Sequence, residues 1–172
     1  MIAVLNLISG LAVTLLTAIN LPNGFEQIPW GTSAQVLQQI VPVHKAQQGS
    51  EYSYAEHMEI DPDVYVRKAA DNQRLEYYLF NNQVYKIFIV YDRSDDDNLQ
   101  YNQLVDKFIG DFGKPHSTYD ETVFGIAVTH TIWEDEHSTL DVRHGAGYVY
   151  QVRVNKKLIK EKSLLQQQRN SI

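Results

Sequence analysis

The chain contains no cysteine. This absence excludes disulfide bonds, thiolate nucleophiles, cysteine-ligated zinc and iron–sulfur clusters. It also excludes the N-terminal lipid anchor of bacterial lipoproteins, which is attached to a cysteine. A fold built from this sequence therefore depends on packing alone for its stability.

Basic residues are few and scattered. The chain has 15 Lys and Arg against 21 Asp and Glu, a net charge of −6, and no basic run longer than Lys156–Lys157. Nucleic-acid surfaces depend on clustered Lys and Arg that neutralise phosphates, so the composition argues against a nucleic-acid partner. With 172 residues, of which 44% are hydrophobic and 21% charged, the chain fits one globular domain with its own core.

The first part of the chain lacks charged side chains, since residues 2–19 read IAVLNLISGLAVTLLTAI. An apolar stretch with a small residue, Ala18, near its end is typical of a secretory signal segment. Two alternatives stay open: an uncleaved membrane anchor, because the stretch reaches the lower limit of a span, and a buried helix of a cytosolic domain. We expect a cleaved signal, a mature chain that starts between Ile19 and Leu21, and an exported protein in the periplasm or at the cell surface.

A first helix is predicted to start at Thr32, because a Thr N-cap with Gln35 three residues later forms a capping box. Apolar residues at helical spacing and a terminating proline follow: Val36, Leu37, Ile40 and Pro42. Three apolar residues in the extended stretch before the helix are expected to pin it to the core: Phe25, Ile28 and Trp30.

Residues 51–91 carry strand patterns. Residues 74–80 and 84–91 flank Asn81-Asn82, a pair that tolerates the positive φ of a tight hairpin turn. The second of these strands, VYKIFIVY, is nearly all β-branched or aromatic and is predicted to be central in the sheet.

A second helix is predicted after Asp95, Asp96, Asp97 and Asn98, which suit capping and the positively polarised helix N-terminus. Gly113 and Pro115 mark its end. Its apolar residues form one stripe: Tyr101, Leu104, Val105, Phe108 and Phe112. Residues 122–134 then read as a single strand with a bulge at Gly125.

Residues 138–143 and 147–154 are predicted to form the last hairpin. If Leu140 and Val142 share a face with the aromatic and branched residues of the second strand, Val142 pairs with Tyr148 across a loop at residues 144–146. The polar tail that follows carries only a partial apolar stripe. We therefore expect that deleting residues 157–172 leaves stability nearly unchanged.

The expected order is helix, three or four strands, helix, three strands, helix. Strands joined mainly by short hairpins indicate an antiparallel sheet with helices packed on one face, which is a single α+β domain. We place this domain at residues 21–155. A signal peptide or uncleaved anchor at residues 1–20 precedes it, and a polar C-terminal helix or tail at residues 156–172 follows it. The two halves of the chain show a loosely similar order of elements, a helix followed by strands.

Four sequence segments carry a family resemblance: FEQIPWGTS before an amphipathic helix, the strand pair YYLFNNQVYKIFIVYD, the helix end DFGKP, and a late TIWED. In this pattern the chain resembles small exported bacterial envelope proteins that have an F-x-x-I-P-W-G-T-S helix start. The resemblance covers about residues 25–154 and implies a signal peptide and a shared fold. Some such proteins are envelope or surface-appendage components, and the resemblance implies no catalytic residue.

Two patterns resemble ion or catalytic loops. DRSDDDN at residues 92–98 has the spacing of a calcium loop, but Asp97 occupies the glycine position and Gln103 the bidentate glutamate position. A solvated helix cap explains it better. HGAG at residues 144–147 is similar to the oxyanion loop of lipases, but the sequence has no G-x-S-x-G elbow to supply a nucleophile. A hairpin turn explains this second pattern.

The histidines and acidic residues give two further hypotheses. The six histidines contain no HExxH motif, and the one zinc hypothesis joins His130, Glu134 and His137 around a charged turn. Glu134 and its acidic neighbours, or Asp141, could supply an acid–base pair. A strand end with a solvated turn explains both patterns better. We therefore predict no catalytic residue, no cofactor and no metal.

The eleven tyrosines suit sheet packing, but they also suit interfaces and sugar-stacking platforms. Tyr148, Tyr150, Leu164 and Leu165 are our predicted interaction surface. The first functional hypothesis is a non-enzymatic exported protein that acts through contacts with other envelope or surface-appendage proteins, as a structural or accessory part of their assembly. It would touch the membrane only through residues 1–20, if these are not cleaved.

The alternative is a binder of a small apolar or carbohydrate ligand between sheet and helices. A ligand binder should have a cavity of several hundred Å³ with an apolar lining and a few convergent polar groups. An assembly protein should instead expose a flat aromatic patch or a free strand edge.

Overall fold

The computed structural model describes residues 19–47, 63–69, 73–91, 93–169 and 171. The helices and strands follow one another as α1 (Ala34–Ile40), β1 (His44–Lys45), β2 (Asp63–Lys68), β3 (Arg74–Phe80), β4 (Gln83–Val90), α2 (Asp97–Phe112), β5 (Ser117–Val123), β6 (Ile126–Glu134), β7 (Ser138–Gly145), β8 (Tyr148–Asn155) and α3 (Lys156–Arg169). The predicted signal segment and the first part of the strand pattern at residues 51–91 lie outside the described residues.

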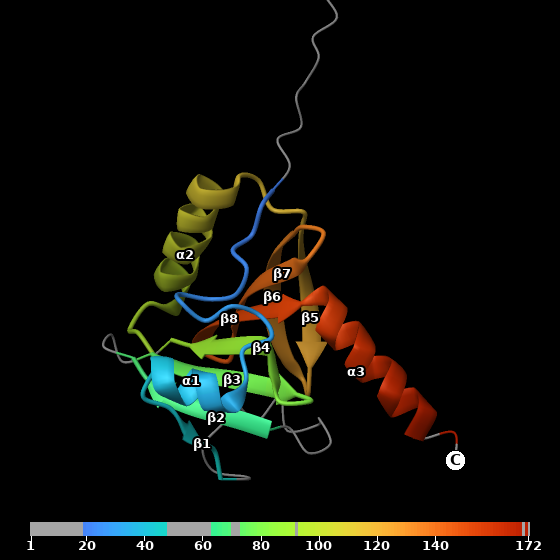
Figure 1. The fold of residues 1–172 in the computed structure, drawn as a ribbon. Helices are drawn as coiled ribbons and strands as arrows, with labels where there is room; N and C mark the ends of the chain where they lie inside the picture. The colour runs from blue at the N-terminus through green and yellow to red at the C-terminus, as the bar shows by residue number, and fades with distance from the viewer. Residues whose placement is uncertain (1–18, 48–62, 70–72, 92, 170, 172) are drawn as a thin grey trace, which may run out of the picture.

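The described strands form one antiparallel sheet in the order β1-β2-β3-β4-β8-β7-β6-β5. Each half of the chain supplies a helix followed by a four-stranded meander, and the two meanders meet where β4 pairs with β8. The similar order of elements in the two halves of the sequence, a helix followed by strands, corresponds to this repeat of topology. The α+β class, the antiparallel sheet and the central position of β4 are confirmed (Figure 1).

The helices do not all pack on one face, and this part of the predicted fold is wrong. Leu37 of α1 packs with Ile87 and Ile89 of β4, and Phe108 of α2 packs with β7 and β8. Leu158 of α3 instead packs with Phe88 and other residues that alternate with Ile87 and Ile89 along the sheet. Since neighbouring strand residues point to opposite faces, the sheet has an α1/α2 face and an α3 face.

The helix α1 begins one residue later than predicted. Ser33 is its N-cap and accepts from the amide of Val36 at 3.4 Å. Thr32 is unavailable for capping because its hydroxyl donates to the carbonyl of Pro29 (2.7 Å) and its own carbonyl accepts from Val84 of β4 (2.9 Å). The expected role of the preceding segment is confirmed, because Ile28 is fully buried against Leu37.

The helix α2 follows its prediction closely. Asp96 is the N-cap and accepts from the amide of Leu99 at 2.8 Å, while Gly113 is the C-cap with φ of 79°. Asp96 therefore acts as the helix cap that the sequence favoured over a calcium ligand. The predicted apolar stripe faces the sheet, with Phe108 buried and its other members partly buried around Trp133 of β6.

Three hairpins use two-residue turns in which both residues have positive φ: Asn81-Asn82, Phe124-Gly125 and Ala146-Gly147. Such turns match the twist of antiparallel strands. The first is the predicted turn. The second shows that the predicted strand at residues 122–134 is wrong, because the chain reverses at Phe124-Gly125 and continues from β5 into β6. Gly125 is a turn residue and not a bulge.

The predicted register of the last hairpin is also wrong. The turn is Ala146-Gly147, so Gly145 pairs with Tyr148 and Val142 pairs with Gln151. Leu140 and Val142 therefore share the α1/α2 face with Val149, and the tyrosines of β8 lie on the other face. The β7–β8 hairpin is not close to an edge either, since β5 and β1 are the outer strands of the described sheet.

The helix α3 is attached to the sheet by its first half. Leu158 is buried in the cluster around Phe88 and Val152, and the buried Lys162 ammonium donates to the hydroxyl of Tyr85 at 2.7 Å. Leu164 and Leu165, in the second half, are exposed. In Figure 1, α3 runs away from the strands toward the lower right. These contacts argue against the expectation that deleting residues 157–172 leaves stability unchanged.

Two truncations separate the halves of α3. A chain that ends at Lys162 keeps Leu158 and the Lys162–Tyr85 bond, and we expect its midpoint of thermal unfolding to stay within a few degrees of the full chain's. A chain that ends at Lys156 loses the buried leucine, which stabilises by about 2–5 kcal/mol at comparable sites, and its midpoint should fall by about 5–20 °C. Circular dichroism measures both midpoints. Equal midpoints for the two truncated chains would show that the contacts of α3 with the sheet contribute little to stability.

The start of the described chain also packs on the body. Ile19 and Leu21 lie against the cluster of Phe108 and Trp133, and the amide of Leu21 donates to the Asp135 carboxylate at 2.7 Å. Among the described residues, no helix combines the length and the apolar character that a membrane span requires.

Candidate functional site

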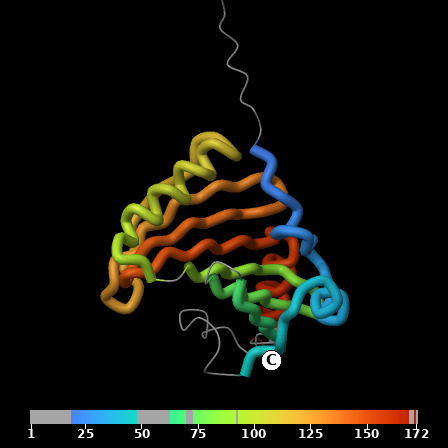
Figure 2. The backbone as a smooth tube through the Cα atoms, turned by 90° about the vertical axis from the view of Figure 1, so that its left-hand side faces the viewer, coloured from blue at the N-terminus to red at the C-terminus, as the bar shows by residue number. Residues whose placement is uncertain are grey.

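A cavity of about 670 Å³ lies on the α3 face, over β4 to β8. Along β5 to β8, the residues that line the cavity alternate with the residues that pack under α2. The register of these strands therefore places the two sets on opposite faces of the sheet. Figure 2 shows β5 to β8, in orange to red, side by side with α2 next to them. The repeat of topology therefore builds two covered sheet regions under α1 and α2, and it leaves the cavity on the opposite side.

Most of the cavity wall is apolar or aromatic. The residues of this wall are Phe88, Val90, Tyr91, Tyr119, Val123, Phe124, Ile126, Val128, Tyr148 and Tyr150. Four of them are among the exposed large hydrophobic side chains of the described chain: Tyr119, Phe124, Ile126 and Tyr148. Apolar side chains gathered around a hollow are characteristic of a ligand site or an interface.

Phe124 is the most unusual residue of this wall. It has φ of 50° in the β5–β6 turn, and its side chain is 73% exposed. Positive φ is costly for a bulky residue, and Asn or Gly is preferred at this turn position. A phenylalanine that is both strained and exposed stabilises neither the turn nor the core. Its position at the cavity is the observation that favours a functional role.

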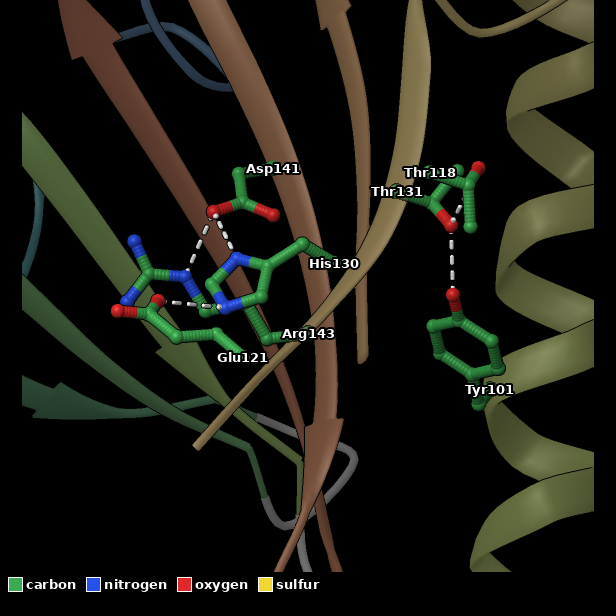
Figure 3. A network of polar contacts seen from close by, with 7 residues as sticks. All are labelled: Tyr101, Thr118, Glu121, His130, Thr131, Asp141 and Arg143. Atoms are coloured by element: carbon green, nitrogen blue, oxygen red, sulfur yellow. Dashed lines mark hydrogen bonds and ion pairs between the residues drawn. The ribbon is translucent and has the colours of Figure 1, made fainter. Parts of the chain in front are cut away.

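A network of polar side chains lies at the base of the cavity. The carboxylate oxygen Oδ2 of Asp141 accepts from His130 Nδ1 at 3.1 Å and from Arg143 Nε at 2.7 Å. Glu121 Oε2 lies 3.5 Å from His130 Nε2, on the other side of the ring. Figure 3 shows these four side chains converging from β5, β6 and β7. The ring of Tyr119 stacks on that of His130 with centroids 4.8 Å apart.

This network fixes the chemistry of the imidazole. Because Asp141 can only accept when it is ionised, Nδ1 of His130 carries the proton of that bond. In the neutral ring, Nε2 is then a hydrogen-bond acceptor that is held in one orientation. His130 and Asp141 are only 5% and 6% exposed. The arrangement can therefore accept hydrogen bonds or a proton at a defined position next to an apolar hollow.

The opposite face of the same strands carries a separate, structural network. Tyr101 of α2 shares a hydrogen bond of 2.6 Å with Thr131 of β6, and Thr118 lies 3.3 Å from the same hydroxyl. Figure 3 shows this group on the α2 side, away from His130. It attaches α2 to the sheet and takes no part in the cavity.

The predicted interaction surface is divided between two places. Tyr148 and Tyr150 line the cavity, with ring centroids 6.0 Å apart. Burial raises the pKa of Tyr150, and the nearby Tyr148 acts in the same direction, so its phenol stays neutral. Leu164 and Leu165 lie on the exposed half of α3 and do not line the cavity.

The network as a unit was not predicted from the sequence. His130 was considered only as a zinc ligand, Asp141 only as one of several acids, and Arg143 had no predicted role. A usable signal was present, because Asp141 and Arg143 stand two residues apart within a strand and so share a face. Their contact with His130 depends on the pairing of β6 with β7, which places Arg143 opposite His130.

The zinc hypothesis receives no support. His130 and Glu134 are both in β6, where four residues of extended chain separate them by about 13 Å, and Glu134 Oε2 pairs with Lys156 at 2.8 Å. Within the described ranges, no group of three or more metal-ligating side chains is placed to hold an ion. The HGAG segment forms the end of β7 and the turn into β8.

Comparison with known proteins adds no assignment: no protein-family model, curated protein or solved structure matches the chain.

Proposed function

We propose that the protein binds a small amphipathic molecule in the cavity over β4 to β8. The observation that carries the proposal is the combination of a cavity of about 670 Å³ with a mainly apolar wall and the polar network of Glu121, His130, Asp141 and Arg143 at its base. Small-molecule sites have this volume and this mixture of apolar wall and convergent polar groups. The proposal assigns binding only and includes no catalytic step.

The proposed site differs from the one expected from the sequence. A ligand was expected between sheet and helices, whereas the cavity lies on the α3 face, opposite α1 and α2. The two tyrosines of β8 supply amphipathic rings to the wall, which suits the stacking of sugars or other flat apolar groups.

A neutral fluorescent probe tests this proposal. N-phenylnaphthylamine becomes brighter in apolar surroundings, and we expect it to bind the full chain. The substitution Val128→Trp puts a large ring into the cavity and should weaken binding by at least about tenfold, the equivalent of about 1.4 kcal/mol. Ala127→Trp is the matched control, because Ala127 is exposed and neighbours Val128 on the same strand but faces away from the cavity.

The two variants give opposite outcomes if the proposal is right. Normal binding by Ala127→Trp together with loss in Val128→Trp supports the cavity. Equal binding by both variants, with circular dichroism showing both folded, would place the probe elsewhere and contradict the proposal.

A second candidate function, protein–protein contact within a cell-envelope or surface-appendage assembly, rests on two other features. Leu164 and Leu165 are exposed on the half of α3 that extends beyond its buried contacts, and β5 is an edge strand with mostly exposed residues. Edge strands and exposed apolar helix faces can both accept a partner. The chain that ends at Lys162 should then stay folded but lose association with its envelope partners, and unchanged association would contradict this role.

Export remains part of both proposals. The apolar residues 2–19 and the resemblance to exported envelope proteins support it. The intact mass of the native protein should correspond to a chain that starts between Ile19 and Leu21. A mass that includes residues 1–18 would favour a retained anchor over a cleaved signal.

A further inference from the structure

Two buried polar atoms at the base of the cavity have no hydrogen-bond partner in the part of the chain that the structure describes: Asp141 Oδ1 and His130 Nε2. Both residues line the cavity. Leaving a buried donor or acceptor unpaired costs free energy, so native proteins satisfy nearly all of them. These two atoms therefore indicate what kind of group the site is built to receive.

Both atoms are hydrogen-bond acceptors. Asp141 is a carboxylate that already accepts two bonds at Oδ2, and its Oδ1 can only accept another. His130 donates a hydrogen bond from Nδ1–H to Asp141, so Nε2 is an acceptor in the neutral form of the ring. A third acceptor, Glu121 Oε2, lies 3.5 Å from Nε2. The two polar atoms left unpaired at this end of the cavity are therefore both acceptors.

The charged side chains at the polar end of the cavity also favour a ligand that donates hydrogen bonds. Arg143 Nε is bound to Asp141 at 2.7 Å, and Arg74 Nε is bound to Glu76 at 2.9 Å, so each of these cations faces a carboxylate. Glu121 adds a further carboxylate beside His130, and its side chain is 55% exposed. An anionic head group would meet carboxylate oxygens here. A head group with hydroxyl or ammonium hydrogens would meet acceptors.

We infer that the ligand has a non-anionic polar head that donates hydrogen bonds, a hydroxyl or ammonium group, held at Glu121, His130 and Asp141. Its apolar part lies along Ile126 and Val128 toward Phe124. The inference rests on the proposed function and specifies the ligand class. Glu121 lies at the exposed rim beside Nε2 and accepts one of the hydrogens of the head group.

Three probes with the same eight-carbon tail test the inference: octylammonium, octyl glucoside and octanoate. Isothermal titration calorimetry measures each below its micelle concentration, on the full chain and on Val128→Trp. We expect octanoate to bind at least about tenfold more weakly than the better of the other two. Octylammonium as the better probe identifies a cation site, and octyl glucoside identifies a neutral hydroxyl site.

Glu121→Gln is the companion variant, because this rim side chain can change without emptying the core. It removes one negative charge at almost constant size and should narrow the preference for octylammonium over octanoate. Octanoate that binds the full chain as tightly as the other probes, or more tightly, would overturn the inference while leaving cavity binding intact. If none of the three probes binds, or if they bind Val128→Trp as tightly as the full chain, the proposed function is overturned and the inference with it.

Discussion

Replacing Phe108 by alanine is expected to lower the free energy of unfolding by about 3–5 kcal/mol, the usual cost of emptying a buried aromatic site. Phe108 is only 3% exposed. Its ring meets Trp133 edge-on at a centroid distance of 5.8 Å and stacks on Phe112 at 5.7 Å. Such pairs stabilise beyond the area they bury. The substitution therefore removes the one buried side chain of α2 among its contacts with the sheet.

Urea titration measures this loss, and Ile109→Ala provides the control. Ile109 follows Phe108 on the same helix but is exposed, so its truncation should change the free energy of unfolding by less than about 1 kcal/mol. A loss of less than about 1 kcal/mol for Phe108→Ala as well would mean that the stripe of α2 contributes little to the core.

Replacing Phe124 by asparagine should move stability and ligand binding in opposite directions. Asn-Gly is the preferred sequence for a turn with two positive φ values, and Phe124 has φ of 50°. Relief of this strain should stabilise the fold by about 0.5–1 kcal/mol. The same substitution removes an aromatic wall of the cavity and should weaken binding of N-phenylnaphthylamine by about tenfold.

Phe124→Leu separates the two effects. It keeps an apolar side chain at the cavity and keeps a residue that disfavours positive φ, so stability should stay nearly constant and most of the affinity should remain. If Phe124→Asn lowers stability, the ring has a packing role that its exposure does not reveal. If affinity is unchanged in Phe124→Asn, the ring is no part of the site.

Local signals predicted the elements that local interactions stabilise. The helix α2 has an acidic N-cap at Asp96, one apolar stripe and a glycine at its end, and each is found in its predicted role. The Asn81-Asn82 turn and the central strand β4 are also found as predicted. In these segments, propensity, pattern and packing all favour the same structure, which is the condition under which a sequence can be interpreted reliably.

The second meander was harder to predict, because its residues do not follow the simple apolar alternation. The strand β5 has the sequence STYDETV and is almost fully exposed at the sheet edge, so it has no apolar pattern to reveal it. On β8, the face under the helices carries the buried Gln151 and Arg153, while the tyrosines face the other way. A register of β7 against β8 that is chosen by matching apolar residues is therefore wrong.

These buried polar residues of β8 satisfy each other. With the Gln151 amide oriented so that its nitrogen faces Tyr91, it donates to the Tyr91 hydroxyl at 3.0 Å and its oxygen accepts from Arg153 Nη2 at 2.9 Å. The guanidinium of Arg153 lies over the ring of Phe25 at 5.0 Å, and burial lowers its pKa to about 10. Tyr91 and Phe25 are distant from β8 in sequence, so the pattern of β8 alone gives no sign that polar groups are tolerated on this face.

The site was predictable only in part. The two tyrosines of β8 were selected as functional because of their residue type, and both line the cavity. The polar network depends on strand pairing: Asp141 and His130 meet because the short turn at residues 135–137 sets the register of β6 against β7. The cavity itself arises from the joining of two meanders at β4 and β8, a long-range feature that no local pattern specifies.

The position of a bound probe tests the central claim, which is that this protein binds small molecules in the cavity on the α3 face. Intermolecular nuclear Overhauser effects between N-phenylnaphthylamine and the protein's methyl groups report that position directly. We expect contacts to Ile126 and Val128, which line the cavity. Contacts to Leu164 and Leu165 of α3 instead, with none to Ile126 or Val128, would contradict it.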